Sequence, residues 1–342
     1  MDILSNLPAI ILLTLIVGFL VFTGFRLGLQ FLVRRVAGLV FVLFAASFVT
    51  FTLGFWSPIT AVDAQLGDKY TPQKAAILHH YYGLDRPFLE QYWSYLTKLL
   101  HFDLGESYLQ RGRSVWSIIS SQLPNSLLLG LSAVTLAVLV GVAAGMLAAL
   151  RANSRYDTAV QGAALFFFAL PTFVLIPFFF IAMIFLYNND IPNLPITSTE
   201  FGFAHPEQMI APILIYSLVQ MAFFVRITRT STLEVTRQDY VRTAKAKGLS
   251  QREVIWRHTF RNSMIPLLTA IGPALAFIVN GALITETLFN IQGLGTTTLS
   301  AITQNNFPVL QGTVILLAVA VALMNLVTDV LYGVVDPRIK SA

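Results

Sequence analysis

Few residues of this sequence have types and spacings that could do chemistry. The chain has no cysteine, which excludes disulfides, thiolate catalysis and zinc–thiolate sites. Gly293-Leu-Gly295-Thr296 combines glycines with a hydroxyl, but a phosphate-binding loop also needs a lysine and a preceding strand. His79-His80 could bind a metal, yet no further ligand follows at a suitable spacing. We therefore predict no metal site, no nucleotide site and no enzyme.

Two acidic residues stand out because of where they lie. Glu286 and Asp329 fall in or near long apolar runs, where ionisable side chains are costly and usually face a bundle interior or water. One interpretation is that they, together with Asn325, line or gate a path. The other is structural, because each lies near the end of its run, where a hydrogen bond or ion pair could hold it at a smaller cost.

The composition indicates what kind of element must carry these residues. Of the 342 residues, 56% are hydrophobic and only 11% are charged, whereas soluble domains carry about 25% charged residues. The membrane class is therefore favoured. The net charge of +5 could suggest nucleic acid, but basic residues of membrane proteins collect in cytoplasmic loops, so we expect no nucleic-acid partner.

Seven apolar runs approach or exceed the roughly 20 residues that a spanning helix needs. They cover about residues 8–25, 36–56, 124–150, 159–187, 210–232, 263–289 and 308–335. The fold class is thus an all-α, polytopic helix bundle. Prolines, among them Pro171 and Pro177, are expected to bend the fourth run.

Lys and Arg predict the orientation of the chain. Most of the 22 lie on one side if the runs alternate, and the two loops near 188–209 and 290–307 have none. Under the positive-inside rule the N-terminus is outside and the C-terminus cytoplasmic. Residues 57–123 then form the one sizeable outer segment, in which Phe88 to Trp93 reads as a short amphipathic helix.

The loop between the fifth and sixth runs, residues 233–262, is the most informative stretch. Residues from about 238 to 247 favour a helix, and Gly248 suits the left-handed position that ends one. Ser250, with Glu253 three residues on, is a capping box that starts the next helix. We expect a rigid double helix below the membrane that continues into the sixth run. The alternative is a basic loop held by anionic membrane lipid.

This loop resembles the signature of permease subunits of ATP-binding-cassette importers, in which a short coupling helix docks on the ATPase. The chain is similar to the B-type permeases of the dipeptide/oligopeptide class over about residues 31–340. The motifs that carry the resemblance are Arg242-Thr243-Ala244-Lys245-Ala246-Lys247-Gly248, Arg257-His258, Asn262, Ile265-Pro266, Tyr82 to Pro87, Asp103-Leu-Gly105, Glu286 to Phe289, Gly293-Leu-Gly295, Asn325, Asp329 and Asp336-Pro-Arg338. Two features depart from the family: residues 55–58 lack its usual Pro-Gly-Asp-Pro, and the first run is additional to its six spans.

The resemblance implies an organisation and a set of partners. Residues 1–30 would be an extra transmembrane helix, 31–56 the first core span, 57–123 an extracytoplasmic segment and 124–340 the permease domain. Residues 242–248 would contact the ATPase. The family implies a homologous second permease, two ATPases that bind ATP and Mg, an external binding protein, and a place in the bacterial plasma (inner) membrane; this chain needs no cofactor of its own.

The sequence is compatible with more than one substrate and more than one class of transporter. Permeases similar to these also carry nickel and other small solutes, so peptides are one interpretation among several. A second class is an ion-coupled secondary transporter, which would need charges near mid-span and, often, inverted repeats. Neither is clear in the sequence.

Overall fold

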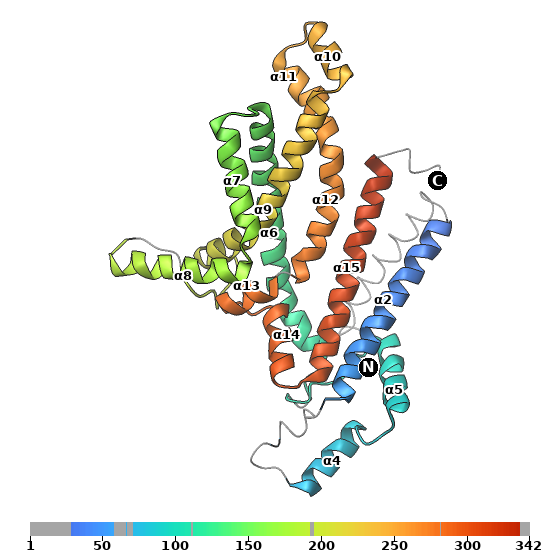
Figure 1. Cartoon of the computed structure of the whole chain (residues 1–342). Coiled ribbons are helices and arrows are strands. Elements are labelled where there is room, and N and C mark those ends of the chain that lie inside the picture. Colours follow the sequence, from blue (N-terminus) through green and yellow to red (C-terminus); the bar gives the residue numbers. More distant parts are fainter. Residues whose placement is uncertain are drawn as a thin grey trace. The chain divides into compact units, whose positions relative to one another are not determined.

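The computed structural model describes residues 29–57, 66, 71–110, 112–191, 195–280 and 282–335. The regular structure of these residues is helical (Figure 1), and two isolated β-bridges, Glu106 with Ser114 and Gly202 with His205, are the only pairing of extended backbone among them. The predicted all-α fold is confirmed. The first predicted run, 8–25, lies outside the described residues.

Within the described ranges the helices follow one another with no sheet between them. In chain order they are α2 (Leu29–Phe55), α4 (Pro72–Tyr82), α5 (Phe88–Leu100), α6 (Val115–Leu150), α7 (Arg155–Ala169), α8 (Thr172–Asn188), α9 (Pro206–Thr236), α10 (Asp239–Ala246), α11 (Gln251–Glu253), the π-helix η2 (Val254–Phe260), α12 (Arg261–Asn280), α13 (Ala282–Phe289), α14 (Leu294–Thr303) and α15 (Phe307–Val335).

Four helices of the described residues are long and apolar enough to cross a membrane. They are Val36–Phe55 of α2, all of α6, all of α9 and Phe307–Asn325 of α15. These match the second, third, fifth and seventh predicted runs. Helix α6 starts at Val115, before the predicted residue 124, because Pro124 lies within the helix instead of beginning it.

The fourth predicted run, 159–187, is not one straight helix. It divides into α7 and α8, whose axes differ by 106° across Leu170 and Pro171. Pro171 is the N-cap of α8, and the residue before a proline disfavours helical backbone. The expected bend at Pro171 is therefore confirmed as a break, whereas helix α8 continues through Pro177.

The sixth predicted run, 263–289, also corresponds to two helices. Helix α12 ends at Asn280 and α13 covers Ala282–Phe289. As expected, α12 is the direct continuation of the loop helices, because η2 ends at Phe260 and α12 begins at the next residue. Helix α11, η2 and α12 thus follow one another without a break from the loop into the apolar helix (Figure 1).

The described residues form two compact units. The first takes those up to Gln122 and from Thr297 to Leu326, and the second takes Leu123–Thr296 and Val327–Val335. In the first unit α5 packs on α2, where Tyr92 is 7% exposed and its hydroxyl lies 3.1 Å from Ser47 Oγ. The amphipathic helix expected from Phe88 is confirmed.

The second unit is built around α9, which packs against α6 and α7. A Cβ on Gly141 would meet the backbone of Met221, and one on Gly145 would meet that of Val225. Only glycine allows these backbones to approach so closely. On the α7 side, Ala164 and Val225 belong to one small apolar cluster. Around residues 221–225, helix α9 is therefore packed closely between α6 and α7.

Candidate functional site: a capped basic knob and a buried carboxylate

A compact polar element joins α9 to α12, and we call residues 237–260 the knob. Helix α10 begins with Gln238 as its N-cap, and only Arg237 separates that cap from the end of α9. The knob therefore continues two long helices, α9 on one side and α12 on the other.

Gly248 ends α10 as the sequence predicts. Its φ is +79°. Its N–H donates to the carbonyl of Lys245 at 3.0 Å, and the N–H of Leu249 donates to that of Ala244 at 3.4 Å. This pair of bonds is the Schellman motif, which satisfies carbonyls left open at a helix end. Because the left-handed backbone strains any residue with a Cβ, glycine is the suited residue here.

Ser250 begins the next helix, also as predicted. Its Oγ accepts a hydrogen bond from the Glu253 N–H at 3.3 Å, which is the first half of a capping box. The Glu253 carboxylate instead lies 3.4 Å from the Arg257 guanidinium, one turn further on. Short-range chemistry thus sets both ends of the turn between α10 and α11.

The knob has its own apolar core. Val241, Ala244 and Val254 are each at most 5% exposed and are packed with Val235 and Leu249. Val235 belongs to the last turn of α9. The core therefore ties the knob to α9 by packing as well as by the chain.

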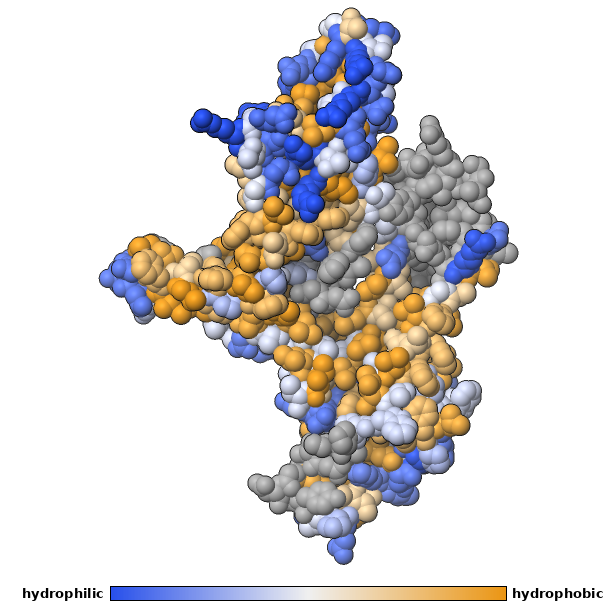
Figure 2. All heavy atoms as spheres, in the orientation of Figure 1, coloured by the Kyte–Doolittle hydropathy of each residue, from blue (hydrophilic) through white to orange (hydrophobic). Residues whose placement is uncertain are grey.

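The outward face of α10 is basic. Arg242, Lys245 and Lys247 are exposed, as are Thr243, Ala246 and Gly248. Arg242 lies 3.7 Å from Asp239, but both side chains are more than 70% exposed, so solvent screens this pair. Partial burial raises the pKa of Tyr240 beside them. Figure 2 shows hydrophilic residues gathered over this end of the second unit and apolar residues over the helices next to it.

Ala244 differs from the other predicted coupling residues. It is 5% exposed and lies in the core of the knob. Its small side chain lets α10 pack on the π-helix, and it is not part of the outward face. A contact between that face and an ATPase stays a prediction for the exposed residues.

The π-helix of the knob was not foreseen. Residues Val254–Phe260 form seven residues of π-helix, whereas π-helices in proteins are usually single-turn bulges, often at functional sites. Thr259 lies within it, 1% exposed. The sequence offers no local signal for this form, because the choice between i→i+4 and i→i+5 bonds depends on packing.

Glu286, a predicted gate candidate, is a fully buried cap for another helix. Its Oε1 accepts from the Ser126 hydroxyl at 2.6 Å, and its Oε2 accepts from the N–H groups of Gly295 at 2.7 Å and Thr296 at 3.4 Å. The preceding N–H, that of Leu294, donates to Ser126 Oγ at 2.7 Å. The carboxylate and the serine thus satisfy the first turn of α14, where a negative charge is also favoured by the helix dipole. This geometry supports the structural interpretation of Glu286.

The nearby glycines serve this cap. A Cβ on Gly293 would overlap the Glu286 carboxylate, and one on Gly295 would overlap the backbone of Leu283. Gly293-Leu-Gly295 is therefore a packing motif around a buried carboxylate.

The remaining gate candidates lie on α15. Asn325 is exposed on this chain, and Asp329 follows one turn later in the same helix. Their role in a path stays a prediction.

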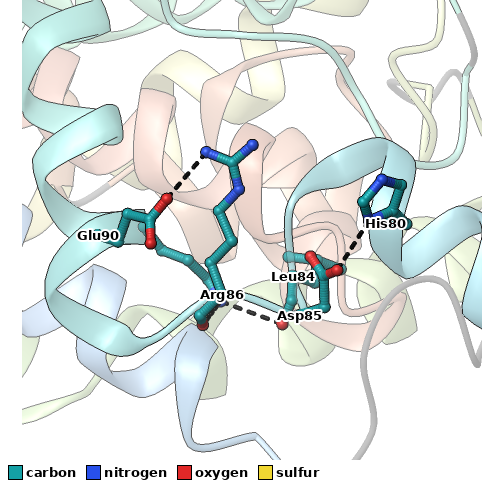
Figure 3. A network of polar contacts seen from close by, with 6 residues as sticks. His80, Leu84, Asp85, Arg86 and Glu90 are labelled. Atoms are coloured by element: carbon teal, nitrogen blue, oxygen red, sulfur yellow. Dashed lines mark hydrogen bonds and ion pairs between the residues drawn. The ribbon is translucent and has the colours of Figure 1, made fainter.

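A small polar network lies at the turn between α4 and α5 (Figure 3). His80 Nδ1 lies 2.8 Å from Asp85 Oδ2, and Arg86 lies 3.2 Å from Glu90. Gln91 Nε2 donates to the carbonyls of Leu84 and Arg86. The hydrogen bond from His80 lowers the pKa of Asp85. Among the described residues no cluster of His, Cys, Asp and Glu could hold a metal ion.

Sequence reasoning missed one ion pair. Asp157 of α7 binds Arg229 of α9 through two hydrogen bonds, at 2.6 and 2.8 Å. Ser154-x-x-Asp157 is a recognisable helix start, and it could have drawn attention to Asp157. Nothing in the local sequence points to Arg229, 72 residues away.

A bundle of long apolar helices that carries a compact basic knob is the architecture of a multi-pass membrane protein. Two family models match the chain: residues 141–341 match the binding-protein-dependent transport system inner membrane component, and residues 28–130 match the N-terminal model of that membrane component. The chain belongs to this family.

Curated relatives are similar in sequence to this protein along nearly its whole length. The chain is 33% identical to the di/tripeptide transport system permease protein DppB of Pseudomonas aeruginosa (strain UCBPP-PA14), over 91% of this chain and 99% of that protein. It is 32% identical to the dipeptide permease DppB of Bacillus subtilis (strain 168) and 34% identical to the oligopeptide permease OppB of Salmonella typhimurium (strain LT2), with similar coverage. The resemblance predicted from the motifs is confirmed.

Proposed function

We propose that this chain is a permease subunit of an ATP-driven importer and forms part of the path for peptides that an external binding protein delivers. The observation that carries the proposal is the knob, because it is continuous with α9 and α12 and has its own core. A movement imposed on α10 would therefore reach both long helices through the packed core of the knob. The names of the relatives support peptides as the substrate class.

The exposed face of α10 is the proposed contact with the ATPases. Arg242, Thr243, Lys245, Ala246 and Lys247 supply a surface that is basic and has small residues between the charges. ATP and Mg belong to those ATPases in this proposal, and the chain itself transmits movement. A homologous second permease completes the path.

The family places the chain in the inner membrane as a multi-pass protein. We propose further that the knob and the C-terminus are cytoplasmic and that the N-terminus and the 57–123 segment are outside. The density of Lys and Arg in the knob supports this orientation through the positive-inside rule.

Two alternatives make different forecasts. A permease of the same family for nickel or another small solute would assemble in the same way and bind no peptide. An ion-coupled secondary transporter would work without an ATPase. The burial of Glu286 in a helix cap weighs against the second alternative, because a coupling carboxylate must exchange its ligands during transport.

Reconstitution tests the proposal. The chain is co-expressed with the second permease, the ATPases and the binding protein of its own transport system, purified and placed in liposomes. We expect ATP-dependent uptake of labelled di- to oligopeptides and ATPase activity that the loaded binding protein stimulates. Uptake driven by an ion gradient without ATP would overturn the proposal, and stimulation by a nickel-loaded or solute-loaded protein alone would move it to the first alternative.

A further inference from the structure

The Asp157–Arg229 pair is the most buried ion pair of the described residues. The Asp157 side chain is 4% exposed and that of Arg229 is 24% exposed. Each remaining ion pair between described residues joins side chains that are at least 40% exposed. Exposed pairs contribute little to holding two elements together, whereas a bidentate Arg–carboxylate pair fixes both distance and direction.

The Asp157 carboxylate is fully engaged on the α7 side as well. The Asp157 Oδ2 accepts from the backbone N–H of Asn153 at 2.9 Å, and the backbone N–H of Asp157 donates to the Ser154 hydroxyl. Asn153 has a φ of +64°, so the chain reverses sharply just before α7. The hydrogen bond from Asn153 therefore fixes the orientation of the Asp157 carboxylate to which Arg229 binds.

Arg229 lies on the direct route from the knob. It is on α9 about two turns before the helix ends at Thr236, and Val235 in the turn between belongs to the knob core. On the far side, α7 leads to the 106° break at Pro171. The ion pair thus joins the helix that carries the knob to the helix that carries the break.

The pair adds a constraint that packing alone does not supply. Between α7 and α9 the apolar contact combines the buried Ala164, Ala222 and Val225 with the partly buried Val160 and Phe167 of α7, and apolar packing has no preferred direction. A bidentate ion pair resists sliding, because both N–H···O bonds must lengthen together.

We propose that Asp157 and Arg229 are positioning residues that make α7 move together with α9 when the knob is displaced. This inference rests on the proposed importer function. The bond passes a movement of α10 on to α7 and so to the break at Pro171. Without it, the knob would still dock and α9 would still move, but α7 would lag behind.

The first experiment measures coupling in the reconstituted importer. Asp157→Asn removes the charge, Arg229→Lys keeps a charge but not the two parallel bonds, and the exchange Asp157→Arg with Arg229→Asp restores a pair. Arg155→Gln, an exposed charge in the same turn of α7, is the control. We expect basal ATPase activity to be unchanged in every variant. In both single variants the stimulation by the binding protein should fall by roughly fivefold or more, which is the size of a usual coupling between sites. The double variant Asp157→Arg with Arg229→Asp should recover part of this stimulation.

The second experiment observes the two helices directly. The chain has no native cysteine, so spin labels at Thr158→Cys on α7 and Thr230→Cys on α9, both exposed, report one distance. We expect that distance to stay the same with and without ATP in the parent and to shift or broaden on ATP binding in Asp157→Asn. Arg229→Lys serves in the same test if Asp157→Asn does not assemble.

The outcomes separate this inference from the function beneath it. A parent importer without binding-protein-stimulated ATPase activity would contradict the proposed function. A stimulated parent whose single variants remain fully stimulated, or whose label distance is the same in parent and variants, would contradict the role of the ion pair and leave the function standing.

Discussion

The Oε1 atom of Glu286 lies 2.6 Å from the Oγ of Ser126, a contact between α13 and α6 that spans 160 residues of sequence. The same serine oxygen accepts from the N–H of Leu294. The hydroxyl therefore both donates and accepts, and it joins the start of α14 to α6 and α13. The Glu286 carboxylate and the Ser126 hydroxyl are thus the centre of a junction of three helices.

The first prediction concerns this junction. Glu286→Ala leaves the N–H of Gly295 and the Ser126 hydroxyl without their partner, at a cost of about 2–3 kcal/mol for bonds to a charged group. We expect a clear fall in the Tm of the purified protein in detergent. Glu286→Gln should fall less because it keeps one acceptor. Glu90→Gln, at an exposed site, is the control, and an unchanged Tm in Glu286→Ala would contradict the junction.

The second prediction concerns Gly295. Gly295→Ala places a Cβ against the backbone of Leu283, which cannot turn aside as a side chain can. Overpacking of this kind costs about 1–3 kcal/mol. Gly162→Ala on α7, where no atom lies within 4 Å of the added Cβ, should be neutral or stabilising by up to about 1 kcal/mol. Thermal unfolding of the two variants side by side gives the comparison, and equal Tm values would refute the packing motif.

The third prediction concerns the turn of the knob. Around Gly248 no atom lies within 4 Å of an added Cβ, so the strain of Gly248→Val comes from its φ of +79° and costs about 1–2 kcal/mol. We expect the knob to twist, coupled ATPase activity to fall and membrane insertion to be normal. If the loop only held lipid, Gly248→Val would be silent, and loss of Arg242, Lys245 and Lys247 alone would matter. If Gly248→Val kept its full coupled ATPase activity, the proposed docking of the knob on the ATPase would be contradicted.

The fourth prediction concerns orientation. A single cysteine placed at Ser94 in the cysteine-free chain should react with a membrane-impermeant maleimide from outside intact cells. A cysteine at Thr243, on the exposed face of α10, should react only after the membrane is opened. The reverse labelling pattern would overturn the proposed orientation.

The fifth prediction concerns the start of the chain. The family match begins at residue 28, so deletion of residues 1–25 should leave assembly with the ATPases largely intact. Pull-down of the tagged ATPase with the shortened chain checks this. Loss of the complex, with normal membrane insertion, would show that the first run is integral to the assembly.

Much of the fold could be predicted from the sequence because its causes are local. Apolar runs of spanning length identified α2, α6, α9 and α15, since a bilayer demands a continuous hydrophobic stretch. Gly248 marked the C-terminal end of α10 and Ser250 marked the start of α11, because a left-handed backbone and a side-chain cap depend only on residues within one turn.

Tertiary structure decided what each chemical group does. By sequence Glu286 could line a path or make a structural hydrogen bond, and the approach of Ser126 and Gly295 supports the structural interpretation. Ala244 fell inside the knob because the π-helix packs over it. The ion pair of Asp157 with Arg229 depends on how α7 lies along α9. Residues that are distant in sequence come into contact only when the helices pack against one another. The free energy of this packing outweighs local helix propensity, so it decides which of several possible local structures the chain adopts.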